Sequence, residues 1–251
     1  MKALIFAAGL GTRLKPLTDT MPKAMVPICG KPLLEHTIVR LKKAGVEAIV
    51  INVHHFANQI IDFVGANNNF GMQIEFSDER DCLLETGGGI KKAAPFFCDG
   101  QPFIVHNVDI LSNLDIRAMY DAHCRSDAAI TLFASNRPTS RHLLFDAGNN
   151  LRAWWNRKTG ETKPANLSAN DIRDYQALAF NGVHVISPDI FPLMHTWEGR
   201  FSIIDFYLSI VQQTRIQAFV YDNCQMIDVG KMDTLAEAES YLFGEASFRM
   251  P

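Results

Sequence analysis

A short apolar strand that runs straight into a glycine loop is the feature that most restricts how this chain can fold. The strand pattern covers Lys2–Ala7, and the segment Ala8-Gly9-Leu10-Gly11-Thr12 follows at once. Three cations surround the glycines, namely Arg13, Lys15 and Lys23. Glycine lets backbone N–H groups come close to an anion. The segment is therefore predicted to hold a polyanion at the carboxyl end of a buried strand.

The first half of the sequence alternates short apolar strands with helical periodicity. Expected strands are Lys2–Ala7, Ala48–Val53, Met72–Phe76 and Pro102–Val105; expected helices are Pro32–Ala44, Ala57–Val64 and one beginning at Gly89. Such alternation predicts an α/β fold, Rossmann-like and doubly wound, with a mainly parallel sheet. The second half offers the strands Ala128–Ala134, His142–Phe145, Leu151–Trp155 and Ala177–Ile186 between polar turns. These favour a mixed or antiparallel layer, with a loop over 157–170 and a last strand near Met226.

Composition excludes several classes of protein. A net charge of -3 over 251 residues gives no reason to expect a nucleic-acid-binding protein, because such proteins usually carry a basic face. No stretch approaches the roughly 20 apolar residues of a membrane span. The five cysteines show no Cys-x-x-Cys spacing, so reduced thiols in a cytoplasmic protein are expected, with neither a zinc site nor a disulfide framework.

Three kinds of phosphate loop compete for the segment from Gly9 onward. A dinucleotide loop needs a third glycine where Leu14 stands, and a Walker loop needs Gly-Lys-Ser/Thr. The third pattern, Gly-x-Gly-Thr-Arg-x-x-Pro-x-Thr closing on Pro-Lys, is matched in full from Gly9 to Lys23. On this motif the chain resembles the sugar-1-phosphate nucleotidyltransferases, and the resemblance extends to about Leu242.

The resemblance implies a fold of the nucleotide-diphospho-sugar transferase type. It implies a single domain over residues 1–245, with a nucleotide-binding half at 1–125, a sugar-binding half at 126–245 and a tail at 246–251. A monomer or homodimer is expected, with a nucleoside triphosphate and a sugar 1-phosphate as its ligands, and with no nucleic acid or membrane partner.

The same resemblance implies roles for individual residues. The family's catalytic positions correspond to Arg13, Lys23 and Asp109, and its Mg²⁺ ligands to Asp109 and Asp228. Nucleotide-binding positions are Ala7, Ala8, Gly9, Gly11, Thr12, Arg13, Glu85, Gly87, Gly88 and Asn107. Sugar-binding positions are Asn181, Gly182 and Lys158. The residue types suit the chemistry, because Mg²⁺ prefers carboxylates and phosphate oxygens and arginine presents a planar fork to phosphate.

Two departures from the family pattern stand out. Val108 replaces the glycine that usually precedes the metal-binding aspartate. The backbone geometry at Asp109 therefore does not follow from the family pattern. The family's Glu-Lys-Pro segment has no clear counterpart near Trp155-Asn156-Arg157-Lys158. The second phosphate-binding lysine is therefore unassigned, with Lys158 as a candidate.

Two motifs resemble the N-acetylmuramate-1-phosphate uridylyltransferases of cell-wall recycling. These are Leu-Glu-Thr-Gly-Gly-Gly-Ile, from Leu84, and the ending Asp-Val-Gly-x-x-x-x-Leu-Ala-Glu-Ala-Glu-Ser. Mannose-1-phosphate guanylyltransferases share much of the N-terminal segment, so GTP with mannose 1-phosphate is the alternative pair. A catalytically silent nucleotide-sugar sensor is a rival from another class. A nicotinamide-dependent oxidoreductase is disfavoured by Leu14.

Overall fold

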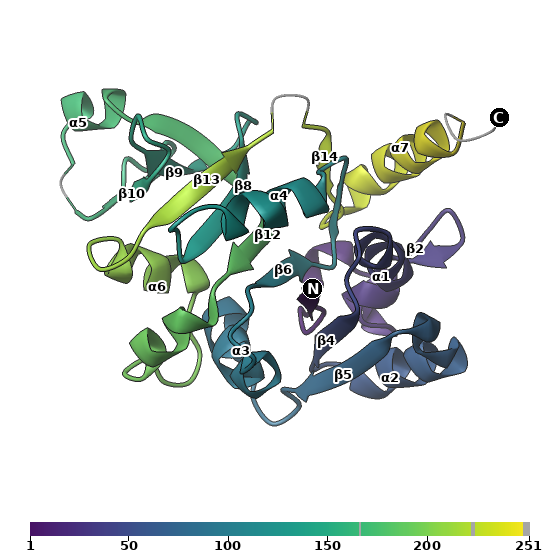
Figure 1. Ribbon diagram of the computed structural model, residues 1–251. Coiled ribbons are helices and arrows are strands. Elements are labelled where there is room, and N and C mark those ends of the chain that lie inside the picture. Colours follow the sequence, from purple (N-terminus) through teal and green to yellow (C-terminus); the bar gives the residue numbers. More distant parts are fainter. Residues whose placement is uncertain (166, 222–223, 248–251) are drawn as a thin grey trace. The chain divides into compact units, whose positions relative to one another are not determined.

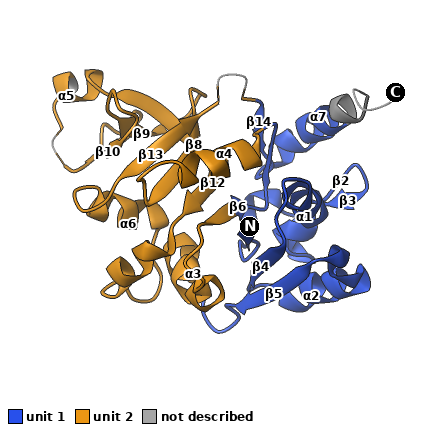
Figure 2. Ribbon diagram, viewed as in Figure 1, with its two compact units in different colours: residues 1–83, 106–113, 225–251 blue, residues 84–105, 114–224 orange. Residues whose placement is uncertain are grey.

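The chain folds into two compact units that are interleaved in sequence. The computed structural model describes residues 1–165, 167–221 and 224–247. One unit comprises residues 1–83, 106–113 and the C-terminal part from 225, and the other comprises 84–105 and 114–224 (Figures 1 and 2). The expected boundary between halves at 125/126 remains a prediction. The expected tail at 246–251 begins inside the last helix, and its residues 248–251 lie outside the described residues.

The first unit contains a parallel sheet in the order β1-β4-β5. Its strands are β1 (Lys2–Phe6), β4 (Ala48–Val53) and β5 (Gln73–Asp78), with Leu4 opposite Val50. Strands β1 and β4 are buried apolar runs, as is typical of parallel strands covered on both faces, whereas β5 alternates polar and apolar residues. Helices α1 (Leu33–Lys43) and α2 (Ala57–Ala66) belong to the same unit. In α1 the apolar side chains recur at three- and four-residue steps, and that stripe is buried.

Two short ribbons and a C-terminal helix complete the first unit. The ribbons pair β2 (Pro27–Ile28) with β3 (Lys31–Pro32) and β7 (Ile110–Ser112) with β14 (Met226–Asp228), both antiparallel. Helix α7 (Leu235–Ser247) follows β14 (Figure 1). The β7–β14 ribbon brings residues more than a hundred positions apart in sequence into register, with Ile110 opposite Asp228.

The second unit contains a mixed sheet in the order β13-β8-β12-β9-β10-β11. Strand β13 runs parallel to β8, and the other pairs in this order are antiparallel. The strands are β8 (Ile130–Ser135), β9 (Arg141–Phe145), β10 (Leu151–Asn156), β11 (Thr162–Lys163), β12 (Gln176–Ile186) and β13 (Ile216–Val220). The expected fold class is confirmed, with its parallel sheet and its mixed, largely antiparallel layer.

The remaining helices lie in the second unit. They are α3 (Glu85–Ala93), α4 (Ile116–Cys124), α5 (Ala169–Arg173) and α6 (Ile203–Ile210). Strand β6 (Phe103–Asn107) begins in the second unit and ends in the first. Helix α3 begins four residues before the expected Gly89, and the expected loop at 157–170 contains β11 and the start of α5. No helix in the described ranges is long and apolar enough to cross a membrane.

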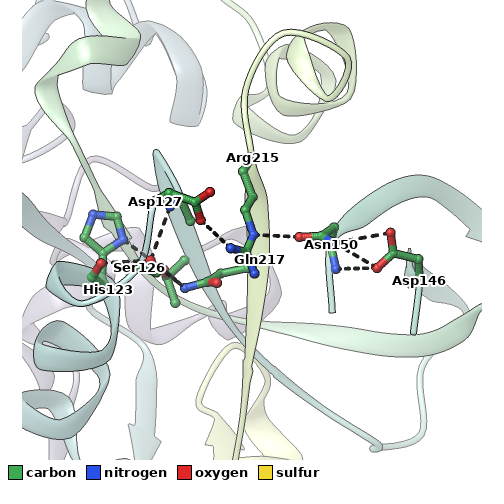
Figure 3. Close-up of polar contacts among 9 residues, drawn as sticks. His123, Ser126, Asp127, Asp146, Asn150, Arg215 and Gln217 are labelled. Atoms are coloured by element: carbon green, nitrogen blue, oxygen red, sulfur yellow. Dashed lines mark hydrogen bonds and ion pairs between the residues drawn. The ribbon is translucent and has the colours of Figure 1, made fainter. Parts of the chain in front are cut away.

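A chain of polar contacts joins β13 to its neighbours in the second unit (Figure 3). Arg215 donates to the Asn150 side chain at 2.8 Å and forms an ion pair with Asp127. Gln217 donates to the hydroxyls of Ser126 and Thr131, each at 3.0 Å. These contacts satisfy polar groups beside the sheet and hold β13 in its register.

Helix α3 lies unusually close to the segment that precedes α6. The Gly87 amide donates to the Phe201 carbonyl at 2.9 Å. A Cβ at Gly87 would lie 2.3 Å from the Phe201 ring, and one at Gly88 would lie 2.4 Å from the Gly199 carbonyl oxygen. Both distances are far below normal contact, so only glycine permits this approach.

Gly88→Ala is therefore expected to destabilise the protein. The new methyl group meets a backbone oxygen that cannot rotate away, and overpacking of this kind costs about 1–3 kcal/mol. The matched control is Gly65→Ala in α2, where a Cβ meets nothing within 4 Å; it should be neutral or stabilising by roughly 0.5–1 kcal/mol. Urea unfolding of both variants checks this, and equal stability of the two would contradict the packing argument.

Candidate active site

The glycine loop closes around Gly11. Gly11 has a left-handed backbone with φ of 63°, and its carbonyl accepts a hydrogen bond from the Thr18 hydroxyl at 2.9 Å. A Cβ on Gly11 would lie 2.8 Å from Thr18 Cγ2 and 3.0 Å from Lys23 Cβ. Leu14 is fully buried and anchors the loop to the core. The motif residues therefore pack on one another, and this packing fixes where the Lys23 side chain starts.

The amides at the end of β1 are held by a buried asparagine. Asn52 Oδ1 accepts hydrogen bonds from the backbone N–H of Ala7 at 2.6 Å and of Ala8 at 3.1 Å. Asn52 Nδ2 in turn donates to Glu79 Oε1 at 2.9 Å, and the Glu79 residue is completely buried. Ala7 and Ala8, both predicted to bind nucleotide, thus have their N–H groups already engaged, while Gly9 and Thr12 are exposed.

Lys23 and Asp109 form a largely buried ion pair in the first unit. The Lys23 ammonium donates to Asp109 Oδ2, and the two side chains are only 13% and 14% exposed. Asp109 directly precedes β7, and its carbonyl accepts from the Val229 amide at 2.8 Å. That bond ties the segment after β6 to the segment after β14. Asn107, a predicted nucleotide ligand, is the last residue of β6.

Asp228 and Arg13 meet beside Gly230. A Cβ on Gly230 would lie 2.6 Å from Asp228 Oδ1 and 2.7 Å from Arg13 Nη2. Asp228 is exposed as a residue, yet its carboxyl packs against its neighbours. This partial desolvation, and then the negative charge of Asp109, raises the pKa of Asp228 above its usual 3.8, while Lys23 and Arg13 oppose the rise.

The structure thus brings four predicted residues together from three distant parts of the first unit. They are Arg13, Lys23, Asp109 and Asp228. Two carboxylates in contact repel each other, and two cations beside them offset that repulsion. The charges of such a site fit a divalent cation together with a polyphosphate, which would replace the internal ion pairs.

The carboxylate pair fits Mg²⁺ in its donor chemistry. Mg²⁺ is commonly held by one or two carboxylates together with water and substrate phosphates. Among the described residues, no group of three or more His, Cys, Asp or Glu side chains is placed to hold a metal. Asp109 and Asp228 would therefore hold Mg²⁺ jointly with a phosphate ligand.

Val108 fits the backbone without distortion. Its φ is not in the left-handed region that favours glycine. Its N–H donates to the Phe6 carbonyl at 3.2 Å, its carbonyl accepts from the Thr37 hydroxyl at 3.3 Å, and it is 3% exposed. Valine is therefore a core residue here and imposes no strain on Asp109.

The remaining predicted nucleotide residues lie in the second unit. Glu85 has a φ of 59°, and its carboxylate accepts from the Arg200 guanidinium at 2.6 and 2.8 Å. Gly87 and Gly88 follow it in α3 and are buried. This segment is held by residues 199–203 at the start of α6, so its position depends on that contact.

The predicted sugar residues fall into two separate environments within the second unit. Asn181 is 1% exposed; its Oδ1 accepts a hydrogen bond from Arg137 Nε at 2.8 Å, and its Nδ2 donates to the Ser135 hydroxyl at 2.9 Å. Gly182 has a φ of 71° at an irregularity in β12. Lys158 lies in an exposed turn after β10, where its amide donates to Asn156 Oδ1 at 3.0 Å. Asn181 therefore positions Arg137, and Lys158 belongs to another part of the unit.

Sequence reasoning did not find Asn52, Glu79 or Arg137. Asn52 could have drawn notice as a polar residue in the apolar run Ile49-Val50-Ile51-Asn52-Val53. Nothing in the local sequence marks Glu79 or Arg137, because their partners Asn52 and Asn181 lie 27 and 44 positions away.

Comparison with known proteins shows the family of the chain. The sequence profile of the nucleotidyl transferase family matches residues 2–243. The chain is 46% identical to an N-acetylmuramate α-1-phosphate uridylyltransferase of Neisseria meningitidis over 120 residues, 48% of this chain and 52% of that protein. It is 32% identical to the enzyme of the same name from Caulobacter vibrioides over 228 residues, 85% of this chain and 86% of that protein.

A solved structure shows the same fold. The UDP-glucose pyrophosphorylase of Acinetobacter baumannii superposes with a TM-score of 0.77 at 17% identity, over 97% of this chain and 93% of that one. The chain thus matches about half the length of the Neisseria protein and most of the length of the other two.

Removing the Asp228 charge is expected to stabilise the metal-free protein at neutral pH. A carboxyl whose folded pKa is raised contributes stability below its unfolded pKa, and that contribution is lost as the pH rises through the folded pKa. Asp228→Asn should therefore melt higher than wild type at pH 7, with the gap closing toward pH 4. Thermal unfolding in EDTA across this range measures it. Asp233→Asn, an exposed control, should show no such pH-dependent gap.

Asn52→Ala is expected to destabilise the protein by about 2 kcal/mol or more. It leaves the Ala7 and Ala8 amides without their side-chain acceptor and removes one donor to Glu79, and each unsatisfied buried group costs about 1–3 kcal/mol. Asn58→Ala, at an exposed position in α2, should change stability by less than about 0.5 kcal/mol. Chemical denaturation compares the two, and a small effect at Asn52 would show that water replaces its bonds.

Proposed function

The chain belongs to the nucleotidyl transferase family, and we propose that it transfers the uridylyl group of UTP to N-acetylmuramate 1-phosphate and releases pyrophosphate. The sugar-1-phosphate nucleotidyltransferase class rests on the family match and on the relatives above. The observation that carries the proposed chemistry is the meeting of Arg13 and Lys23 with Asp109 and Asp228. The choice of UTP and N-acetylmuramate is supported by the two relatives of that name.

The reaction needs charge neutralisation more than proton transfer. The attacking group is an oxygen of the sugar phosphate, which is already ionised near pH 7, so no general base is required. The difficulty is that two polyanions must meet and that negative charge grows on the departing pyrophosphate. Preorganised cations in a partly desolvated site address both problems.

Lys23 and Arg13 would take different parts in this reaction. The Lys23 ammonium, now on Asp109, would exchange that carboxylate for the reacting phosphates when substrate binds. The Arg13 guanidinium is exposed and beside Gly230, and its fork would bind two oxygens of the departing pyrophosphate. Gly230 leaves room for that guanidinium, because a Cβ there would lie 2.7 Å from Nη2.

Mg²⁺ held by Asp109 and Asp228 would supply Lewis-acid stabilisation of the phosphate oxygens. Before it binds, the protein carries the cost of a partly desolvated carboxyl beside a second carboxylate, and these two causes, in that order, raise the pKa of Asp228. We therefore propose that the metal and the triphosphate bind together. All five cysteines are free thiols, which is in keeping with the proposed cytoplasmic location.

A grid of substrates tests the proposal directly. Pyrophosphate release is measured with Mg²⁺ for UTP, GTP, dTTP and CTP against the α-1-phosphates of N-acetylmuramate, N-acetylglucosamine, glucose and mannose. Turnover with UTP and N-acetylmuramate 1-phosphate is expected. Turnover only with GTP and mannose 1-phosphate would keep the chemistry and overturn the substrate pair. Nucleotide binding without any turnover would favour the sensor.

Arg13→Ala is expected to lower kcat by about 10²–10³-fold, the usual effect of removing one preorganised donor from an anion-stabilising site. Lys15→Ala is the matched control, since Lys15 lies in the same loop, is exposed and pairs with Asp19 at 3.0 Å. It should stay within about twofold of wild type, because exposed ion pairs contribute little. Steady-state kinetics compares them, and equal losses would mean that the loop acts only through its overall charge.

A further inference from the structure

Glu85 adopts a backbone conformation that residues other than glycine rarely take. It is the first residue of α3 in the second unit, drawn in orange in Figure 2, and its φ of 59° lies in the left-handed region. A side chain with a Cβ costs free energy in that region, and glycine does not. Costs of this kind are found most often where a site needs a particular geometry. A carboxylate at position 85 is therefore expected to have a use other than stability.

The Glu85 carboxylate is held by one guanidinium. Arg200 Nε and Nη2 donate to Glu85 Oε1 at 2.8 and 2.6 Å. The side chains of Glu85 and Arg200 are 40% and 62% exposed. An ion pair with that exposure adds little to the stability of a fold, because water screens it. What the pair does fix is the place of residue 85 relative to the segment that precedes α6.

Backbone contacts continue from this pair along the same two segments. The Phe201 amide donates to the Leu84 carbonyl at 3.3 Å, and the Gly87 amide donates to the Phe201 carbonyl at 2.9 Å. The Ile203 amide donates to the Thr86 hydroxyl at 3.0 Å. Residues 84–87 and 200–203 thus form one hydrogen-bonded strip, and the Glu85–Arg200 pair lies at its exposed side.

The chemistry of this strip fits the uncharged part of a nucleotide. Glu85 is the one charged residue in the segment 84–89, and a carboxylate repels phosphate. The Phe201 ring packs on Gly87 and is 8% exposed. Backbone groups beside small and aromatic residues are typical of the parts of a site that orient a ligand. The base is therefore a better fit than the triphosphate, whose charges suit the four charged residues of the first unit.

We propose that Arg200 is a positioning residue for the nucleotide base. Through Glu85 it holds the backbone of Thr86, Gly87 and Gly88 in the orientation that contacts the base. The inference rests on the proposed function, because it takes these residues as part of the nucleotide site. It goes beyond that function by giving a part in base selection to Arg200, which lies 115 positions from Glu85 in sequence.

Losing the pair would free the backbone at residue 85 to leave the left-handed region. The bonds from Thr86 and Gly87 to the segment before α6 would then form only part of the time. Binding would have to order this segment, and that ordering lowers affinity. Discrimination would fall as well, because the edges of uracil and cytosine differ in the places of their donors and acceptors. The step at the phosphates would be unchanged once the nucleotide is bound.

The test uses the full-length protein and five variants of the pair: Arg200→Ala, Arg200→Lys, Glu85→Ala, Glu85→Gly, and Arg200→Ala combined with Glu85→Gly. Arg117→Ala is the matched control. Arg117 lies in α4 of the same unit, and its side chain is 57% exposed and pairs with Asp121 at 3.6 Å. Calorimetry with Mg²⁺ measures the binding of UTP and CTP, and steady-state kinetics gives KM and kcat. Hydrogen exchange of residues 84–90 and thermal unfolding report on the segment and on the whole fold.

Arg200→Ala should weaken UTP binding and raise its KM by about tenfold, with kcat within about threefold of wild type. Its preference for UTP over CTP in kcat/KM should also fall by about tenfold. Exchange over residues 84–90 should be faster, while the melting temperature changes no more than in Arg117→Ala. Each of these values in Arg117→Ala should match wild type.

The other variants separate the pair from its backbone effect. Arg200→Lys keeps the charge without the planar fork, so it should recover part of the affinity. Glu85→Ala keeps a Cβ in the left-handed region without the pair, so it should behave like Arg200→Ala. Glu85→Gly should restore UTP affinity in the Arg200→Ala background, because glycine takes this φ without steric cost.

Several results would overturn the positioning role. One is equal UTP affinity in Arg200→Ala and Arg117→Ala. Another is a loss of kcat at unchanged KM, which would mean that Arg200 acts on the chemical step, and a third is a defect that Glu85→Gly deepens. Calorimetry and exchange need no turnover, so the two proposals can fail separately. A protein that turns over no substrate pair but loses UTP affinity in Arg200→Ala would refute the proposed function and support the positioning role.

Discussion

Two carboxylates in contact are the constraint around which the first unit is built. Asp109 and Asp228 repel each other, and burial makes that repulsion stronger than it would be in water. The protein offsets it with Lys23 and Arg13, which enter from the glycine loop. Closing that loop requires the left-handed backbone at Gly11 and the buried Leu14. The glycine loop, the end of β6 and the β7–β14 ribbon are therefore held together by the balance between these two carboxylates and two cations. A metal ion and a triphosphate carry the charges needed to take the place of those contacts.

Close approach without a side chain recurs at three places, each for a different reason. Gly11 lets the loop fold back on Thr18, Gly88 lets α3 meet a backbone carbonyl, and Gly230 leaves space for the Arg13 guanidinium. In the first two cases the neighbour is fixed, so a methyl group disturbs packing. At Gly230 the neighbours are the ends of the Asp228 and Arg13 side chains. A methyl group there would change the orientation of these side chains and leave the fold intact. Some of these glycines are thus required by the packing of the fold and one by the orientation of the charged side chains. The sequence motifs do not distinguish the two cases, and the structure does.

The β7–β14 ribbon holds the active-site carboxylates in place. Ile110 in β7 lies opposite Asp228 in β14, and Asp109 immediately precedes β7. The Asp109 carbonyl accepts a hydrogen bond from the Val229 amide at 2.8 Å, so the backbone joins the two carboxylate positions directly. Two residues more than a hundred positions apart in sequence are therefore kept side by side in the site.

Much of the fold followed from local patterns. The alternation of apolar runs with helical periodicity predicted the α/β class, and β4 has the expected bounds Ala48–Val53. Leu14, standing in place of a third glycine, separated the loop from dinucleotide-binding loops. Helix α3 was placed too late because Glu85 has a positive φ and glycines follow it, which in sequence reads as loop. Strand β13 was not expected, since its place depends on its pairing with β8.

By itself the sequence determined which residues carry charge and which segments are apolar, because periodicity and residue type are local properties. It thereby determined the fold class, and the resemblance of its motifs to a known family named the four charged residues. Only the tertiary structure decided what each polar group contacts. Asn52 holds the Ala7 and Ala8 amides, and Asn181 is buried under Arg137 instead of facing outward. Hydrogen bonds between residues tens of positions apart are chosen by packing, and no local pattern of sequence encodes that choice.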